Sequence, residues 1–267
     1  MHSAPSVICR RAYAFPRLRE ITWWQLASIW VRLYWYKRTK FEMTAPPPIE
    51  LGKRRESDEG PKARLIKESI RLFARHGIEG VSIRALNKAA AVSSQNAVYH
   101  YFGDIWGLVE AAIEVSLQRY LTGVSAILDA AEAETSGPLP LKAVVEAMVR
   151  PIVRIASSPE GMASLQFLAR MIGGSGARGK EVIAREWRGV AERVNDLVYH
   201  AVPENGREAA GAKALFAFNT ALNVVVDIGL EAYWPLETKN TDRLDRYLLD
   251  YIEGGIRFSS KPIESCS

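Results

Sequence analysis

Apolar residues recur along most of this chain at the three- and four-residue spacing of amphipathic helices. No run of strand length alternates convincingly between polar and apolar positions, and glycine and proline separate the periodic stretches. Pro151 lies inside one of these stretches and should kink the helix near Met148. The pattern predicts an all-α protein, with its later helices at about residues 139–157, 160–172, 178–201, 206–231 and 241–257.

The earlier helices are predicted from single residues that start or stop a helix. A first helix should begin at Pro61, with Asp58 or Glu59 as its cap, and should end at Gly77. Asp104 should cap a fourth, longer helix. Two short helices are expected between the first helix and the fourth.

These two short helices lie in VSIRALNKAAAVSSQNAVYHYF, residues 81–102, and the break between them predicts a helix-turn-helix. Ser82 should cap the first, and Ser93 or Ser94 the second. Short polar side chains at the start of a recognition helix reach base edges, and Gln and Asn pair bidentately with adenine. The predicted base-reading residues are Ser93, Ser94, Gln95 and Asn96.

Other residues of this stretch suit the DNA backbone. Ser82 can present its hydroxyl and amide to a phosphate, and Arg84 adds a positive charge. A run of three rings supplies further phosphate-reaching groups, while the apolar residues beside it should anchor the helix. The alternative is that the rings pack inward, but three consecutive helical residues cannot all face one side. The rings are those of Tyr99, His100 and Tyr101.

The net charge of +5 and the pI of about 9.2 support DNA binding less than they suggest. Residues 1–42 hold eight Lys and Arg against two Glu, so the rest of the chain is close to neutral. Residues 61–110 carry seven basic against four acidic side chains. The helix-turn-helix therefore has only a modest local excess of positive charge.

Residues 1–42 also hold four of the seven tryptophans, and their apolar run at 21–36 is too short to span a bilayer. Three interpretations stay open: sequence read in frame ahead of a start at Met43, a disordered or loosely helical extension, and a helix on a membrane surface. Residues 44–60 are rich in proline and charge and predict a flexible arm, in which residues 53–55 could follow DNA phosphates.

Neither a metal site nor a catalytic site is indicated. Cys9 and Cys266 lie near opposite ends without metal-like or disulfide spacing, which fits a reducing cytoplasm, and no two histidines are spaced as ligands. Residues 174–179 match G-x-G-x-x-G, but an apolar helical stretch precedes them where a dinucleotide site needs a strand, so we expect a loop. We therefore expect no catalytic residues, no metal and no cofactor.

Residues 62–110 resemble the DNA-binding domain of the TetR (tetracycline-repressor) family of bacterial transcription regulators. The matching segments are RLIKESIRLFARHGIEGVSIRAL, the turn into AAAVSS, and VYHYFGDIWGLVEAAI. The resemblance implies three N-terminal helices on a larger helical domain, which dimerises through its last two long helices, here about 206–231 and 241–257. It also implies a palindromic DNA operator and a small apolar effector that enters a cavity among the middle helices.

Candidate residues for lining that cavity are Tyr120, Met148, Phe167, Met171 and Trp187. Ordinary core packing is the alternative for each of them.

Three positions depart from the family pattern. Ala91 stands where the turn usually has glycine, so a positive φ there would strain the backbone. Asn87 replaces a small apolar residue and must either face solvent or find a partner. Ile105 replaces a basic residue that usually contacts phosphate, which puts that contact in doubt.

The sequence as a whole predicts a cytoplasmic, homodimeric regulator, a repressor rather than an activator, that performs no catalysis. Two other classes stay open: a membrane-associated sensor, which rests on residues 21–36, and a helical enzyme with an incidental helix-turn-helix. The expected divisions are an extension and arm at 1–60, a DNA-binding domain at 61–106, an effector and dimerisation domain at 107–258, and a tail at 259–267.

Overall fold

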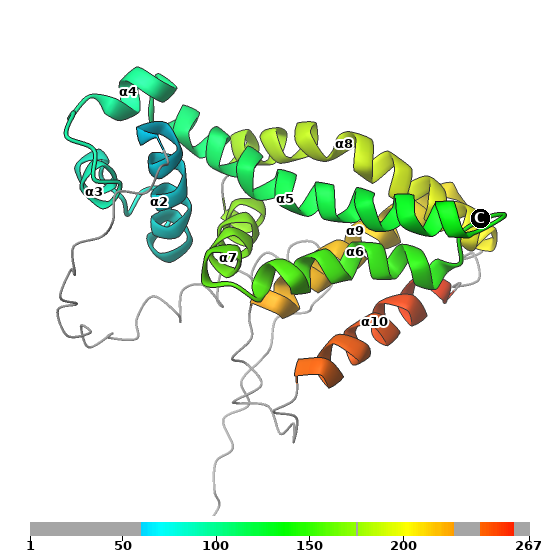
Figure 1. Ribbon diagram of the computed structural model, residues 1–267. Helices are drawn as coiled ribbons and strands as arrows, with labels where there is room; N and C mark the ends of the chain where they lie inside the picture. Colours follow the sequence, from blue (N-terminus) through cyan, green and yellow to red (C-terminus); the bar gives the residue numbers. More distant parts are fainter. Residues whose placement is uncertain (1–59, 175, 227–240, 259–267) are drawn as a thin grey trace, which may run out of the picture. The chain divides into compact units, whose positions relative to one another are not determined.

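The computed structural model describes residues 60–174, 176–226 and 241–258, and within them every regular element is helical (Figure 1). This confirms the expected all-α class. The predictions for the N-terminal extension and arm, and for the C-terminal tail, lie outside the described residues. The helices are α2 (Pro61–His76), α3 (Ile83–Ala89), α4 (Ala97–Phe102), α5 (Ile105–Glu134), α6 (Leu141–Ala156), α7 (Pro159–Gly174), α8 (Gly176–Ala201), α9 (Arg207–Val226) and α10 (Thr241–Arg257), with a 3-10 turn at Pro203–Asn205 before α9.

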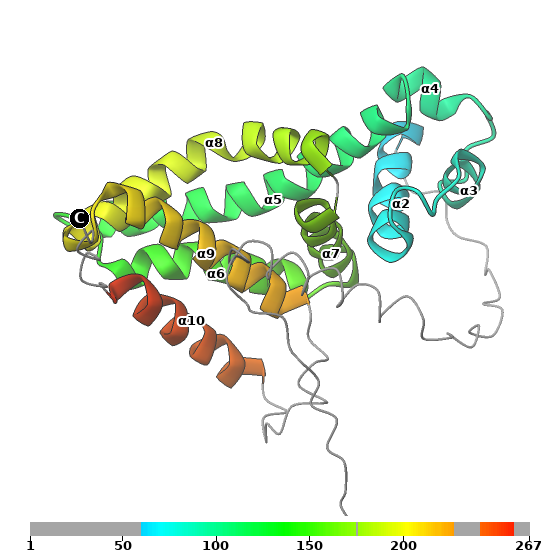
Figure 2. The same ribbon diagram turned by 180° about the vertical axis from the view of Figure 1, so that it is seen from behind.

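The first three helices pack together around apolar side chains and lie at one end of α5 (Figures 1 and 2). Leu65 and Phe73 of α2, Leu86 of α3 and Val98 of α4 are all fully buried. α2 also packs against α7, where the Phe73 and Phe167 rings lie 6.1 Å apart. These three helices therefore pack against the larger bundle through α5 and α7.

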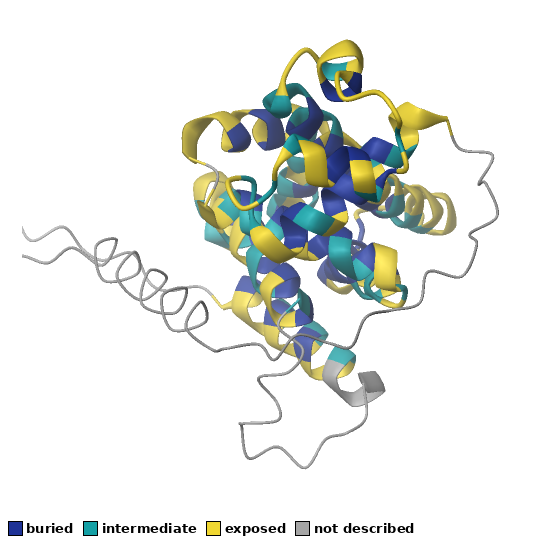
Figure 3. Ribbon diagram, turned by 90° about the vertical axis from the view of Figure 1, so that its left-hand side faces the viewer, coloured by how far each residue is buried: buried dark blue, intermediate teal, exposed yellow. Residues whose placement is uncertain are grey.

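In the larger bundle, the 30-residue α5 packs against α6, α7 and α8, and α9 packs against the same three helices and α10. Buried and exposed residues alternate along these helices, so that each helix has a buried and an exposed side (Figure 3). α9 is long and apolar enough, by length and composition, to cross a membrane, as the core helix of a soluble protein also can be. It packs against four neighbouring helices, α6, α7, α8 and α10, and 39% of its apolar window is buried.

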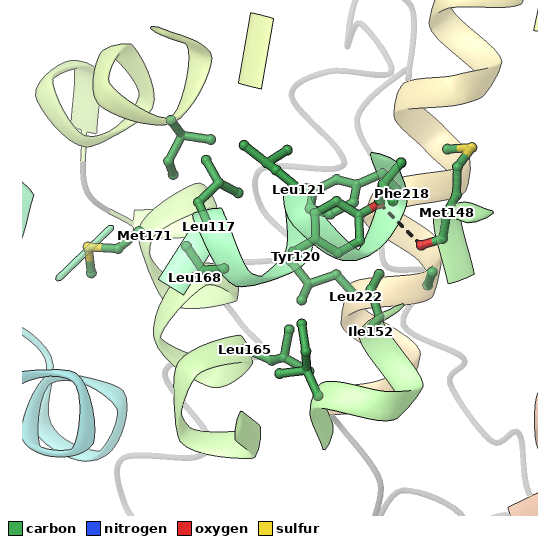
Figure 4. Packing of buried hydrophobic residues seen from close by; sticks show 14 of the residues in the cluster. Leu117, Tyr120, Leu121, Met148, Ile152, Leu165, Leu168, Met171, Phe218 and Leu222 are labelled. Carbon is green, nitrogen blue, oxygen red and sulfur yellow. Dashed lines mark hydrogen bonds between the residues drawn. The ribbon is translucent and has the colours of Figure 1, made fainter. Parts of the chain in front are cut away.

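Tyr120 of α5 lies at the centre of this bundle, 2% exposed. Its hydroxyl donates a hydrogen bond to the main-chain carbonyl of Met148 at 3.1 Å, and its ring lies 5.4 Å from that of Phe218 (Figure 4). Burial raises the pKa of the Tyr120 phenol well above its usual range, so the group stays protonated and remains a donor.

The crossing of α5 and α6 depends on a residue without a side chain. A Cβ atom added to Gly123 of α5 would lie 2.9 Å from the Cβ of Pro151, which is buried inside α6. The glycine therefore allows the two helices to approach closely at the proline.

Outside the two short helices α3 and α4, the helix ends agree with the predictions except at two places. Gly77 ends α2 with a φ of 74°, as expected, but the N-cap is Gly60, which makes no side-chain capping bond. The Asp58 or Glu59 cap was therefore wrong. The predicted loop at 174–179 was wrong for its described residues, because Gly174 is the last residue of α7 and residues 176–179 begin α8.

Candidate nucleic-acid interface

The exposed corner formed by α3, α4 and the turn between them carries all the predicted DNA-binding residues. Ser82 caps α3 as expected: its Oγ accepts a hydrogen bond from the amide of Ala85 at 3.2 Å. Ser82 and Arg84 are both exposed at this end of α3. The hydroxyl proton of Ser82 and the Arg84 guanidinium are therefore accessible to a phosphate, whose oxygens accept hydrogen bonds.

The turn after α3 is a Schellman motif with alanine in the usual place of glycine. Val92 donates its amide to the carbonyl of Asn87 at 2.9 Å, and Ala91 donates to that of Lys88 at 3.2 Å. Ala91 has a φ of 51°, and it is the one non-glycine residue in the described part of the chain with a positive φ. The strain expected from the sequence is therefore present, because an L-residue costs roughly 1–2 kcal/mol in this conformation.

Asn87 holds the far side of the turn. Its side chain is 7% exposed, and its Nδ2 donates to the main-chain carbonyl of Gln95 at 3.0 Å. Its Oδ1 is buried without a hydrogen-bond partner within the described structure. Asn87 thus has a partner rather than facing solvent, and it ties the end of α3 to the residue just ahead of α4.

We predict that Asn87→Asp lowers the free energy of unfolding by about 3 kcal/mol at neutral pH, because it places an unpaired buried carboxylate against the Gln95 carbonyl. Burial should raise the pKa of that carboxyl above its unfolded value. The deficit is then largest above the folded-state pKa and shrinks as the pH falls through it. Urea unfolding at pH 7 and pH 4 measures this; Asn87→Ala, which buries no charge, should show a deficit of about 1 kcal/mol without that pH dependence.

The predicted start of the second helix was wrong. α4 begins at Ala97 with Asn96 in the N-cap position and no side-chain capping bond, so neither Ser93 nor Ser94 is the cap. The predicted base-reading residues therefore lie on the turn immediately before α4 rather than in its first helical turn. All four are exposed: Ser93, Ser94, Gln95 and Asn96.

α4 is held by two small apolar residues and presents its rings outward. Ala97 and Val98 are 2% and 0% exposed, whereas Tyr99 and Tyr101 are 54% and 37% exposed. His100 is exposed too, and its ring lies edge-on to Tyr101 with centroids 4.9 Å apart. The inward-packing alternative is therefore wrong for these three rings.

The junction between α4 and α5 fixes the helix from its other end. Gly103 ends α4 with a φ of 80°, and Asp104 caps α5 as predicted, its Oδ1 accepting the Gly107 amide at 2.7 Å. Ile105, half-buried, packs against the core. At this position the chain thus has a packing side chain where the TetR family usually has a basic residue.

Four of the five candidate effector residues belong to the hydrophobic core, and Trp187 packs against it. Tyr120 contacts Met148 through its hydroxyl, and its ring lies 5.4 Å from that of half-buried Trp187. Phe167 packs against Phe73 of α2. Met171 comes from the same helix as Phe167 and is likewise buried.

Sequence reasoning missed Phe218, which completes an aromatic cluster with Tyr120 and Trp187. The Trp187 and Phe218 rings meet edge to face with centroids 4.0 Å apart. Phe218 lies on α9, whose apolar residues include many small ones. The apolar pattern of α9 alone did not show which of its side chains faces α5 and α8. Among the described residues, no three His, Cys, Asp or Glu side chains are grouped as metal ligands.

The geometry defines a helix-turn-helix protein, and two family models match the chain. The model for bacterial regulatory proteins of the tetR family matches residues 65–112, and the model for the tetracyclin repressor-like C-terminal domain matches residues 146–255. The chain belongs to the TetR family of bacterial transcription regulators.

Solved structures with this fold have low sequence identity to the chain. The fatty acid degradation regulator FadR from Bacillus halodurans is 15% identical, with a TM-score of 0.56 over 75% of this chain and 99% of its own. A transcriptional regulator from Rhodococcus sp. Rha1 is 20% identical, with a TM-score of 0.53 over 73% of this chain and 93% of its own. No curated protein matches the chain.

Proposed function

We propose that this protein is a homodimeric repressor that binds a palindromic operator and is released by a small apolar effector. The observation that carries the proposal is the exposed α3–α4 corner, where polar side chains and rings project from a backbone anchored by buried Leu86 and Val98. Such a corner places amides and hydroxyls at base edges while rings and cations meet the phosphates.

The roles of the residues follow from their chemistry. Gln95 and Asn96 pair with base edges, and Ser93 and Ser94 add shorter donors and acceptors. The residues that hold the phosphates lie on either side of them: Ser82, Arg84, Tyr99, His100 and Tyr101.

We predict that Gln95→Ala and Arg84→Ala separate these two roles. Gln95→Ala should cost about 1–3 kcal/mol on the operator and little on random duplex, because it removes only a base contact. Arg84→Ala should weaken binding to all duplexes alike and lower the slope of log K against log salt by about one. The operator comes from selection in a random pool, and anisotropy titrations measure both; equal losses on operator and random duplex for Gln95→Ala would contradict base reading.

The dimer is supported by an apolar stripe on two adjacent helices. Phe216 and Val224 lie eight residues apart on α9, and Tyr247 and Tyr251 lie four apart on α10, so each pair shares a helix face. These side chains are exposed by 39–72% in the single chain. Exposed apolar side chains of this kind are covered in a homodimer by the same residues of a second copy.

The effector is proposed to act where Tyr120, Trp187 and Phe218 meet, among α5, α8 and α9. These aromatic side chains favour a largely apolar molecule, because the one hydroxyl among them already donates to the Met148 carbonyl. The alternative of a helical enzyme has less support, because Glu68 is the one buried carboxylate among the described residues and it pairs with Arg71 at 2.8 Å.

A further inference from the structure

We propose that Arg64 of α2 is a positioning residue for DNA recognition, which holds the strained Ala91 turn in place and so fixes where Gln95 and α4 stand. This inference rests on the proposed DNA-binding function. Arg64 lies on the first helix, 26 residues before the turn, and belongs to neither of the helices that would meet DNA.

The contact is specific in its geometry. The Nε of Arg64 donates to the carbonyl of Ala90 at 3.0 Å, and one terminal amine donates to the carbonyl of Ala91 at 3.5 Å. Ala90 is the C-cap residue of α3, and Ala91 is the residue of the Schellman motif that has a positive φ. A planar guanidinium reaches two neighbouring acceptors in a fixed orientation, which a lysine ammonium does not.

The turn needs such support because its residue pays the conformational cost that glycine avoids. With a φ of 51°, Ala91 is held left-handed by its neighbours rather than by its own preference. Charge-assisted hydrogen bonds to carbonyls are about twice as strong as neutral ones. The bond from the Arg64 Nε to the Ala90 carbonyl therefore contributes on the same scale as the strain at Ala91, and the longer contact with Ala91 adds less.

The Ala91 turn also positions Gln95, which is proposed to read bases. Asn87, whose carbonyl accepts the Val92 amide, also donates its side-chain amide to the carbonyl of Gln95. From Arg64 the connections thus run through three consecutive contacts to the residue proposed to read bases. Lys62, two residues earlier on α2, lies 5.9 Å from the Phe102 ring at the other end of α4. α2 therefore contacts both ends of residues 90–102, the recognition segment, which comprises the turn and α4.

The alternative role for Arg64 is direct contact with a phosphate, and the two roles predict different losses. A lost phosphate contact weakens all duplexes equally and lowers the salt slope by about one. A lost positioning contact weakens the operator selectively, because non-specific binding needs charge but not an exact placement of Gln95.

The test compares Arg64→Gln with Arg75→Gln, an exposed arginine on the same helix that loses the same charge. We expect Arg64→Gln to weaken operator binding about tenfold further than Arg75→Gln does, the scale of one well-made polar contact, with equal binding of random duplex. Adding Ala91→Gly to Arg64→Gln should restore most of that loss, because glycine adopts the positive φ without strain. Operator and random-duplex anisotropy titrations over a salt series measure these quantities.

Equal losses on operator and random duplex, or no rescue by Ala91→Gly, would overturn the positioning role. A second measurement is independent of DNA: amide hydrogen exchange at Ala91 and Val92 should be about tenfold faster in Arg64→Gln than in wild type. Unchanged exchange at these amides also overturns the inference. If the wild-type protein selects no duplex, the proposed function fails, and the exchange measurement still shows whether Arg64 holds the turn.

Arg64→Lys, which keeps the charge, should lose operator affinity to an intermediate degree; full wild-type affinity would assign the effect to charge alone.

Discussion

Gly107→Ala is expected to lower the free energy of unfolding by about 3 kcal/mol, the upper end of what overpacking costs, and to abolish measurable operator preference. A Cβ atom at this position overlaps with the main-chain carbonyl oxygen of Phe102 and lies 3.0 Å from its carbonyl carbon. Both atoms belong to the backbone at the end of α4, so no side-chain rotation relieves the overlap. α4 must instead shift relative to α5.

The same substitution disturbs the cap of α5, since the Gly107 amide donates to Asp104. Gly189→Ala is the matched control: Gly189 lies in the interior of α8, and an added Cβ has no neighbour within 4 Å. That variant should gain about 0.5–1 kcal/mol from helix propensity and keep full operator binding. Urea unfolding and anisotropy titrations measure both variants. A Gly107→Ala protein with wild-type stability and operator preference would show that the α4–α5 junction does not constrain the recognition segment.

The double variant Phe216→Glu/Tyr251→Glu is expected to be monomeric and to lose operator affinity by a factor of about 10²–10⁴. In the single chain these rings are 63% and 72% exposed, so the charges cost the monomer little. In a two-fold symmetric interface each substitution occurs twice, and four carboxylates would be buried together. Loss of the dimer converts two linked half-site contacts into one, which removes the gain from effective concentration.

Sedimentation velocity measures the oligomeric state, and titrations with whole and half operators measure the affinity. Val115→Glu is the control, because Val115 is an exposed apolar residue, 47% accessible, on α5 rather than on the proposed dimer face. It should leave both the dimer and operator binding unchanged. A dimeric double variant would place the interface elsewhere on the chain.

The sequence predicted the helices well where their limits depend on local chemistry. Gly77 and Asp104 end and begin helices through their own conformation or side chain, and both predictions are confirmed. The cap of α4 was wrong because a serine is a good cap wherever it stands, and its position relative to the helix start depends on packing. Ala97 and Val98 are buried where α4 packs against α3 and α5, and that burial decides where α4 begins.

The candidate interface shows the same division. Polarity and spacing were enough to identify the short polar run before α4 and the three rings of α4. The structure leaves all of these residues exposed. Which residues support them was beyond the sequence. In the sequence, Arg64 is one of several charged residues on an amphipathic helix. Only the fold brings its side chain to the Ala91 turn.

By itself, then, the sequence determined the helical class, the helix-turn-helix and its exposed residues, because periodicity, capping and polarity act over a few neighbouring positions. Tertiary structure alone decided the contacts between distant residues: Arg64 with the turn, Tyr120 with Met148 and Phe218, and Gly123 with Pro151. Each depends on the crossing of two helices far apart along the chain. That crossing is set by the shapes of whole packed faces, which no local stretch of sequence contains.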